Sequence, residues 1–182
     1  MVDLGTLGGT SAGANAVNAK GQVVGTSTIV GDATYHGYFW TGQQGMVDLG
    51  TLGGTWSVAG IINDSGQVAG VSATTGDAEQ HAFSWTKAGG MVDLGTLGGT
   101  FSYPLAVSAH GQVVGFATTA GDAETHAFVW TRSSGMVDLG TLGGTYSLAQ
   151  FVNSNSRAAG YSNLAGDAET HATVWEISES HA

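Results

Sequence analysis

Short extended segments, each closed by turn residues, run along the whole chain. In residues 46–90 they are Met46–Leu49, Ser57–Ile62, Gln67–Ser72 and His81–Thr86. The loop between the second and third segments has Asn first and Gly last, which is the composition of a β-turn. The loop from the fourth segment to the next unit is also of hairpin length, whereas the longer loop ATTGDAEQ between the third and fourth segments is still compatible with antiparallel neighbours. This pattern predicts an antiparallel meander of short strands.

The meander is repeated, because the sequence MVDLGTLGGT occurs four times without a substitution. Its positions are 1–10, 46–55, 91–100 and 136–145. The spacing is 45 residues, which defines the repeat units 1–45, 46–90, 91–135 and 136–180. A fixed period of this length is typical of solenoids, propellers and arrays. The Gly-rich stretch GTLGGT separates meanders, so each sheet should consist of the second, third and fourth segments of one unit and the first segment of the next.

Four such sheets predict an all-β fold, a four-bladed β-propeller with four antiparallel strands per blade, in a single repeat domain spanning 1–182. The last unit ends its meander at His171–Trp175, and Met1–Leu4 has no preceding strands to complete. We therefore expect the N-terminal strand to pair with the last blade and close the ring. A solenoid or a β-prism-like stack is the alternative.

Composition supports an all-β fold with many tight turns. Gly accounts for 31 of the 182 residues and Pro for one, while 42% of the residues are hydrophobic, which argues against disorder. Charged residues make up only 10% of the chain. With no Cys, the redox compartment cannot be inferred.

The charge balance excludes two classes of partner. The formal net charge is -10 and Lys and Arg together number four, too few to neutralise many phosphates. We therefore expect no binding to nucleic acid and none to anionic membranes. No apolar run approaches the ~18 residues of a spanning helix, so membrane insertion is not expected. The chain begins directly on a repeat, and no signal peptide is recognisable.

Several repeated motifs resemble a known family. HAFSW at 81–85, HAFVW at 126–130 and GQVVG at 21–25 and 111–115, together with MVDLGTLGGT, resemble the HAF repeats of bacterial extracellular proteins. The first and fourth units depart from the HAF pattern, with His36-Gly37-Tyr38 and His171-Ala172-Thr173. The resemblance implies a secreted repeat scaffold and no established activity.

The motif GDAExH offers candidate metal ligands. Its members are Asp77, Glu79 and His81, then Asp122, Glu124 and His126, then Asp167, Glu169 and His171. Alternate residues of an extended segment share a face, so Glu and His project together and the Asp could complete an oxygen-rich Ca²⁺ site. The alternative is a structural network that ties a loop carboxylate to the histidine. The first unit has Thr34 in place of Glu, which favours the structural network, so we expect no cofactor.

Two further repeated positions have structural interpretations. The aspartates of MVDLGTLGGT should accept hydrogen bonds from the amides of the following turn; they are Asp3, Asp48, Asp93 and Asp138. The tryptophans of the fourth segment should be buried between blades; they are Trp40, Trp85, Trp130 and Trp175.

Aromatic residues of changing identity follow the Gly-rich stretch, at Trp56, Phe101 and Tyr146, with Tyr103 two residues further in the third unit. They are the candidate ligand-binding residues, for stacking on a sugar ring or docking a protein. Cover for the neighbouring blade is the alternative interpretation.

No catalytic motif accompanies these features: GxSxG, HExxH and a Walker-type loop are all absent from the sequence. We predict a secreted, non-enzymatic scaffold that binds glycan or protein through one end of the ring. The alternative is a structural protein that self-associates by exchange of its N-terminal strand. A metal-binding or enzymatic propeller is the third possibility.

Overall fold

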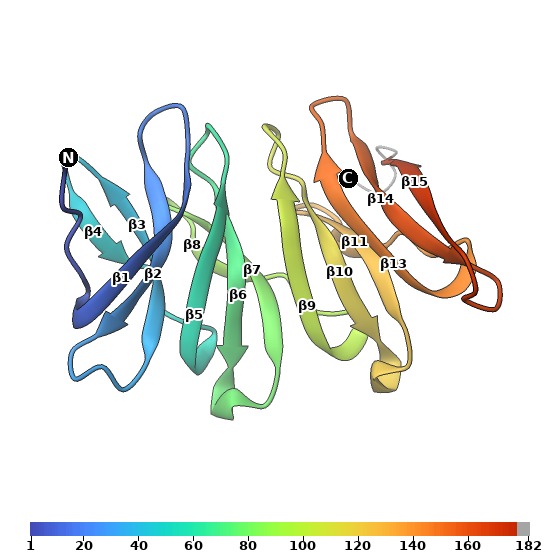
Figure 1. Ribbon diagram of the computed structural model, residues 1–182, viewed down its shortest axis with the longest axis horizontal. Helices are drawn as coiled ribbons and strands as arrows, with labels where there is room; N and C mark the ends of the chain where they lie inside the picture. The colour runs from blue at the N-terminus through green and yellow to red at the C-terminus, as the bar shows by residue number, and fades with distance from the viewer. Residues whose placement is uncertain (178–182) are drawn as a thin grey trace. The chain divides into compact units, whose positions relative to one another are not determined.

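The computed structural model describes residues 1–177 and shows an all-β protein (Figure 1). The chain divides into two compact units, Met1–Asp93 and Leu94–Ala182. The prediction of an all-β fold is confirmed. No helix among the described residues is long and apolar enough to cross a membrane.

The first unit contains two meanders of four antiparallel strands. The strands of the first are β1 (Gly8–Val17), β2 (Val23–Ile29), β3 (Tyr35–Thr41) and β4 (Gly45–Asp48). Those of the second are β5 (Gly53–Ile62), β6 (Val68–Thr74), β7 (Gln80–Thr86) and β8 (Gly90–Asp93), with the short 3₁₀ segment η1 (Thr75–Asp77) before β7. Within each meander, every strand pairs with the next in sequence.

Up to residue 177, the second unit repeats this arrangement with one strand fewer. Its first meander comprises β9 (Gly98–Val107), β10 (Val113–Thr119), η2 (Ala120–Asp122), β11 (Thr125–Thr131) and β12 (Gly135–Asp138). Its second comprises β13 (Gly143–Val152), β14 (Arg157–Leu164) and β15 (Thr170–Glu176). A single parallel bridge, between Thr125 and Tyr146, joins β11 to β13.

The motif MVDLGTLGGT is divided between two sheets, as predicted. In β4, Met46 lies opposite Trp40 and Val47 opposite Phe39, so this strand completes the sheet of the preceding repeat. The following strand, β5, begins at Gly53, earlier than the predicted Ser57, because Gly53 already lies opposite Thr74, with an irregularity in the pairing before Ser57. The turn after β5 is also confirmed, since the Gly66 amide donates to the Asn63 carbonyl at 3.0 Å.

The predicted closed four-bladed propeller is wrong. Residues 1–6 belong to no strand, and the one strand neighbour of β15 among the described residues is β14, so the expected pairing of Met1–Leu4 with His171–Trp175 is not made. The strands form a four-stranded sheet, β1–β4, and an 11-stranded mixed sheet that contains β5 to β15. Neither sheet closes on itself. The 45-residue period fixes the meander, whereas closure depends on the rotation between successive sheets, which a period does not encode. No ring end is therefore available as a binding surface.

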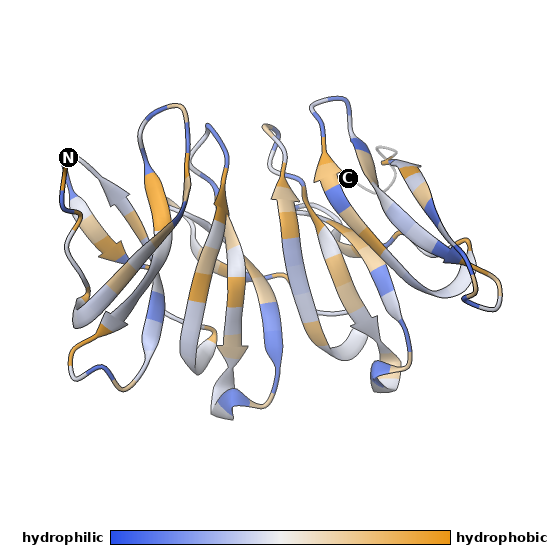
Figure 2. Ribbon diagram, in the orientation of Figure 1, coloured by the Kyte–Doolittle hydropathy of each residue, from blue (hydrophilic) through white to orange (hydrophobic). Residues whose placement is uncertain are grey.

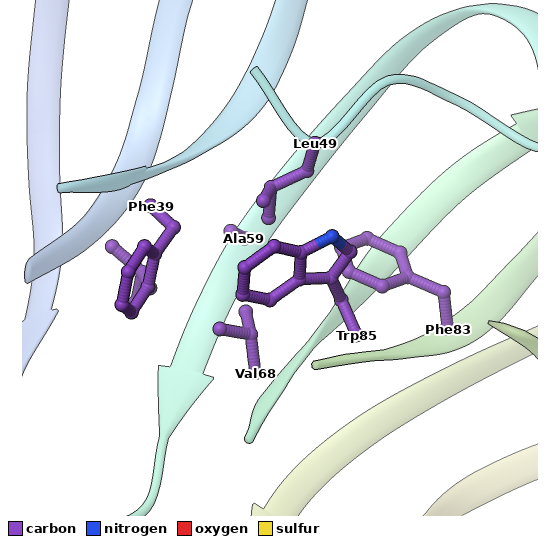
Figure 3. Packing of buried hydrophobic residues seen from close by; sticks show 7 residues of the cluster. Phe39, Leu49, Ala59, Val68, Phe83 and Trp85 are labelled. Atoms are coloured by element: carbon purple, nitrogen blue, oxygen red, sulfur yellow. The ribbon is translucent and has the colours of Figure 1, made fainter. Parts of the chain in front are cut away.

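The core of the first unit lies between its two sheets. Figure 3 shows Phe39 from β3 on one side and Trp85 and Phe83 from β7 on the other, with Ala59 and Val68 between them. The rings of Phe39 and Trp85 are 5.2 Å apart. Figure 2 shows apolar residues distributed along the strands and hydrophilic ones gathered at many turns. Burial of a tryptophan between successive sheets is thus confirmed for this repeat.

The second unit has an equivalent core, formed by Val114, Ala127, Val129, Ala149, Ala158 and Ile177. These residues come from both of its meanders. Val129 of β11 packs in this cluster with Ala149 of β13 and Ala158 of β14. Side chains from one face of a sheet are therefore buried against the first two strands of the next repeat.

Candidate functional site

The aspartate of the GDAE loop is directed at the start of its own repeat. Asp77 has a left-handed backbone, with φ of 55°, and its carboxylate accepts hydrogen bonds from the amide and hydroxyl of Thr55 at 2.7 and 2.9 Å. Asp122 makes the same pair of contacts with Thr100, at 2.8 and 2.9 Å. This aspartate therefore locks the loop to the first strand of its repeat.

Hydrogen bonds to these aspartates stabilise the ionised carboxylate. The hydroxyl of Thr118 contributes most to Asp122 and the Thr100 amide next, and together they hold the pKa of Asp122 below its ordinary value. The pKa of Asp167 is lowered in the same way, chiefly by the Thr145 amide. Proton release is thus favoured by donors that the fold holds in place.

The histidine of GDAExH lies between two carboxylates. In the second repeat, Nε2 of His81 lies 2.8 Å from a Glu79 oxygen, and Nδ1 lies 2.9 Å from Asp93. In the third repeat, His126 contacts Glu124 and Asp138, each at 2.8 Å. The second carboxylate comes in both cases from the next MVDLGTLGGT motif, twelve residues further along the chain.

The first and fourth repeats have incomplete versions of this arrangement. His36 contacts Asp48 at 2.9 Å, but Thr34 replaces the glutamate. His171 lies 3.4 Å from Glu169, and no aspartate contact to it is present among residues 1–177. Its side chain is 54% exposed, against 12% for His81. The degree of burial of each histidine therefore follows the presence of the aspartate-bearing strand.

The two carboxylates determine the protonation of His126. Burial disfavours the charged ring, but the hydrogen bonds to Asp138 and Glu124 outweigh it and raise the pKa of His126. A neutral imidazole carries one proton and could satisfy only one of two acceptors, whereas the imidazolium donates to both. The raised pKa therefore favours an ion pair, in which the imidazolium donates to both acids.

The predicted metal ligands are not brought together as a set. Glu79 and His81 do meet, but the Asp77 carboxylate is engaged by Thr55, and the second carboxylate at the histidine is that of Asp93. Among residues 1–177, no group of three or more His, Asp or Glu side chains is arranged to hold a metal ion. The geometry matches the structural polar network that was the alternative interpretation.

The aspartates of MVDLGTLGGT also have the predicted turn contact. The Gly50 amide donates to Asp48 at 2.7 Å, and the Gly140 amide donates to Asp138 at 2.7 Å. The second role of these residues, as partners of the histidine, is absent from the sequence interpretation. The recurrent spacing of twelve residues between His36 and Asp48 was the available signal.

The candidate aromatic residues each contact a ring that the sequence reasoning missed. In the second unit, Tyr103 lies 5.9 Å from Phe116 and 6.3 Å from Phe101, with interplanar angles of 22° and 17°. We call these three residues the Tyr103 surface. Tyr103 is 38% exposed, so the face of this stack is accessible to solvent. Its position directly opposite Phe116 in the β9–β10 pair was the missed signal.

The other two candidates form separate pairs. Trp56 lies 5.9 Å from Tyr35 in the first unit, and Tyr146 lies 6.1 Å from Tyr161 in the second. Burial, with a smaller contribution from Tyr161, raises the pKa of Tyr146. Tyr146 thus stacks on a ring of its own sheet, because β13 pairs with β14.

No protein-family model matches the chain, and no curated protein matches it.

Proposed function

We propose that this protein is a non-enzymatic, secreted binding scaffold that holds a neutral glycan on the Tyr103 surface. The observation that carries the proposal is the stack of Phe101, Tyr103 and Phe116, which leaves Tyr103 substantially exposed. Similarity of the motifs to the HAF repeats of extracellular bacterial proteins supports the location.

The stack has the properties that a sugar ring requires. A pyranose presents an apolar face of C–H groups, which packs on an aromatic ring, and hydroxyls at its rim that bond to polar groups. Tyrosine offers an apolar ring and a phenolic hydroxyl on one rigid side chain. Because Phe101 and Phe116 support the Tyr103 ring from within the sheet, little side-chain freedom is lost on binding.

Charge selects among glycans. The chain carries a net charge of -10, so uronic acids and sulfated or phosphorylated sugars are repelled. A neutral oligosaccharide meets no such penalty.

Binding without catalysis agrees with the histidine geometry. Both ring nitrogens of His81 and of His126 are occupied by carboxylates, so neither ring is free to serve as a general base. The GDAE aspartates are engaged by threonines.

A glycan array that includes neutral and anionic sugars, followed by calorimetry on the best ligand, tests the proposal. We expect a neutral glycan to bind, and Tyr103→Ala to weaken it by about tenfold or more, the loss of ~1.4 kcal/mol expected for a central aromatic contact. Phe151→Ala removes an exposed ring outside the Tyr103 surface and is the matched control. Absence of neutral glycan binding, or equal binding by Tyr103→Ala, contradicts the proposal.

A further inference from the structure

The outer edge of β15 differs from that of its three counterparts. β3, β7 and β11 each pair on the outer side with a strand from the next MVDLGTLGGT motif, namely β4, β8 and β12. After Trp175 the sequence continues as Glu-Ile-Ser-Glu-Ser and not as a turn followed by that motif. Among the described residues, β15 therefore pairs with β14 alone.

Two side chains on β15 are also more exposed than their counterparts in the other repeats. Val174 is 61% exposed, whereas its counterparts Phe39 and Val129 are 3% and 0% exposed. His171 is the one histidine of the four GDAExH-type positions with no aspartate contact among the described residues. An apolar residue and an imidazole thus lie along one unpaired strand edge.

A further copy of the segment that completes the other three sheets is present at residues 1–4, and this copy pairs with no strand. Met1–Leu4 is identical in sequence to Met46–Leu49, yet residues 1–6 belong to no strand. Val2 is 71% exposed, and Asp3 accepts a hydrogen bond from the Gly5 amide at 3.0 Å. Asp48 makes the same turn contact and additionally holds His36, a contact that Asp3 does not have in this structure.

We propose that Met1–Leu4 of one molecule adds as an outer strand to β15 of a second molecule. The register follows from the internal repeats, where Trp40 lies opposite Met46, Phe39 opposite Val47 and Tyr38 opposite Asp48. Transferred by whole repeats, it places Met1 opposite Trp175, Val2 opposite Val174 and Asp3 opposite Thr173. The Leu4 amide then donates to the Ala172 carbonyl, as Leu49 does to Gly37 and Leu139 to Ala127.

The charge and the apolar surface of the two segments are complementary. Asp3 supplies the carboxylate that His171 lacks, and Val2 covers Val174. Backbone hydrogen bonds provide affinity, and the side-chain contacts fix the register, as in other cases of strand addition.

The proposed interface also includes side-chain packing between sheets, because successive repeats within a unit pack in this way. In the second unit, Val129 is buried with Ala149 and Ala158 of the following repeat. The corresponding residues for Val174 are Ala14 and Val23 of the second molecule. Ala14 is exposed and Val23 partly buried, so both are accessible for packing.

Such an interface joins two different surfaces, the N-terminal segment of one molecule and the β15 edge of another. After the first contact one molecule of the pair still has a free β15 edge and the other a free Met1–Leu4 segment, so assembly continues head to tail. The inference rests on residues distinct from the Tyr103 surface, so it stands or falls independently of glycan binding.

Two variants block the two surfaces separately. Val174→Lys places a charge where the acceptor strand must be covered, and Val2→Lys does so on the donor segment. Both positions are exposed, so neither variant should disturb the fold of the single molecule. Val30→Lys changes an exposed valine outside both surfaces and is the control.

Sedimentation velocity over a range of concentrations gives the result. We expect the wild type and Val30→Lys to form species larger than a dimer as concentration rises, and each blocked variant alone to remain monomeric. An equimolar mixture of the two blocked variants should form dimers and nothing larger, because one donor and one acceptor remain. A monomeric wild type at every concentration, or blocked variants that assemble as the wild type does, overturns the proposal.

Discussion

Nδ1 of His126 lies 2.8 Å from a carboxylate oxygen of Asp138, and the two residues belong to different copies of the 45-residue repeat. The contact spans the pairing of β11 with β12, where Phe128 lies opposite Asp138. It shows that a repeat in this chain is not a self-sufficient unit. Each meander receives its last strand, and its histidine the second carboxylate, from the sequence that follows.

The Asp138 contact predicts that replacing the motif's aspartate lowers stability more at Asp138 than at Asp3. Asp138→Ala removes the partner of His126 and the acceptor for the Gly140 amide, so we expect the free energy of unfolding to fall by about 1–2 kcal/mol. Asp3→Ala removes only the acceptor for Gly5, which is exposed, and should stay within ~0.5 kcal/mol of the wild type. Urea denaturation at a concentration that keeps the protein monomeric measures both. Equal losses contradict the role assigned to the histidine contact.

The pKa shifts of His126 and Asp122 predict that the free energy of unfolding is greatest at intermediate pH and falls at both higher and lower pH. The pKa of His126 is raised, so its contribution is fully present below the ordinary value of about 6.5 and is lost as pH rises through the folded value. The pKa of Asp122 is lowered, so its contribution is present above the ordinary carboxyl value and is lost as pH falls through the folded value. NMR titration of the His126 ring should give a midpoint above 6.5, and Glu124→Gln should reduce it. A midpoint at or below the ordinary value contradicts the ion pair.

Position 54 must be glycine because strand β5 passes very close to the Thr74–Asp77 loop of the same repeat. A Cβ at this position would lie 2.5 Å from the Thr74 carbonyl oxygen and 2.6 Å from an Asp77 carboxylate oxygen. We expect Gly54→Ala to cost about 1–3 kcal/mol, since the strand and the loop must separate. Gly60 lies in the same strand, and a Cβ there would have no neighbouring atom within 4 Å, so Gly60→Ala should be nearly neutral. Thermal denaturation of both variants distinguishes close packing from a general cost of alanine in β5.

Ser57 links the two sheets of the first unit. Its buried hydroxyl accepts a hydrogen bond from the Gly37 amide at 2.9 Å and donates to the Gly50 carbonyl at 2.6 Å. Ser57→Ala leaves the Gly37 amide without this acceptor, and we expect a loss of about 1–3 kcal/mol in chemical denaturation. Ser65→Ala, at an exposed turn, is the control and should change little. A neutral Ser57→Ala shows that this bond does not join the sheets.

The first repeat has Ala12 where the others have this serine. In the head-to-tail interface, Ala12 of one molecule faces the Ala172 amide of the other, by transfer of the Gly37–Ser57 contact. We therefore expect Ala12→Ser to tighten self-association by about fivefold, the equivalent of one hydrogen bond of ~1 kcal/mol. Sedimentation equilibrium measures the dissociation constant, with Ala78→Ser as an exposed control. An unchanged constant for Ala12→Ser contradicts the packing of Ala14 and Val23 on Val174.

The local structure was predictable because it depends on short-range signals. The Asn63–Gly66 turn, the pairing of Met46 and Val47 with the preceding repeat and the turn contact of Asp48 all follow from residue type and loop length. The extended Gly53 and Gly54 were not predicted, because glycine is uncommon in strands and here it is selected by the nearby loop.

Longer-range features were not predictable in the same way. Ring closure depends on the small rotation between successive sheets, which arises from side-chain packing such as that of Phe39 on Trp85. The partner of His81 was missed because the candidate set was confined to one contiguous motif, whereas Asp93 arrives from the next strand. Phe116 was missed for the same reason, since its proximity to Tyr103 is a cross-strand relationship.

Hydrogen exchange at three equivalent leucine amides tests most directly whether the motif's first strand always completes a preceding sheet. Leu49 donates to the Gly37 carbonyl and Leu139 to the Ala127 carbonyl, at 3.0 and 2.9 Å, so both amides should be protected at every concentration. The Leu4 amide should exchange rapidly in dilute solution and become protected as molecules associate. Protection of Leu4 in the dilute monomer, or rapid exchange of Leu4 in the assembled state, contradicts the account.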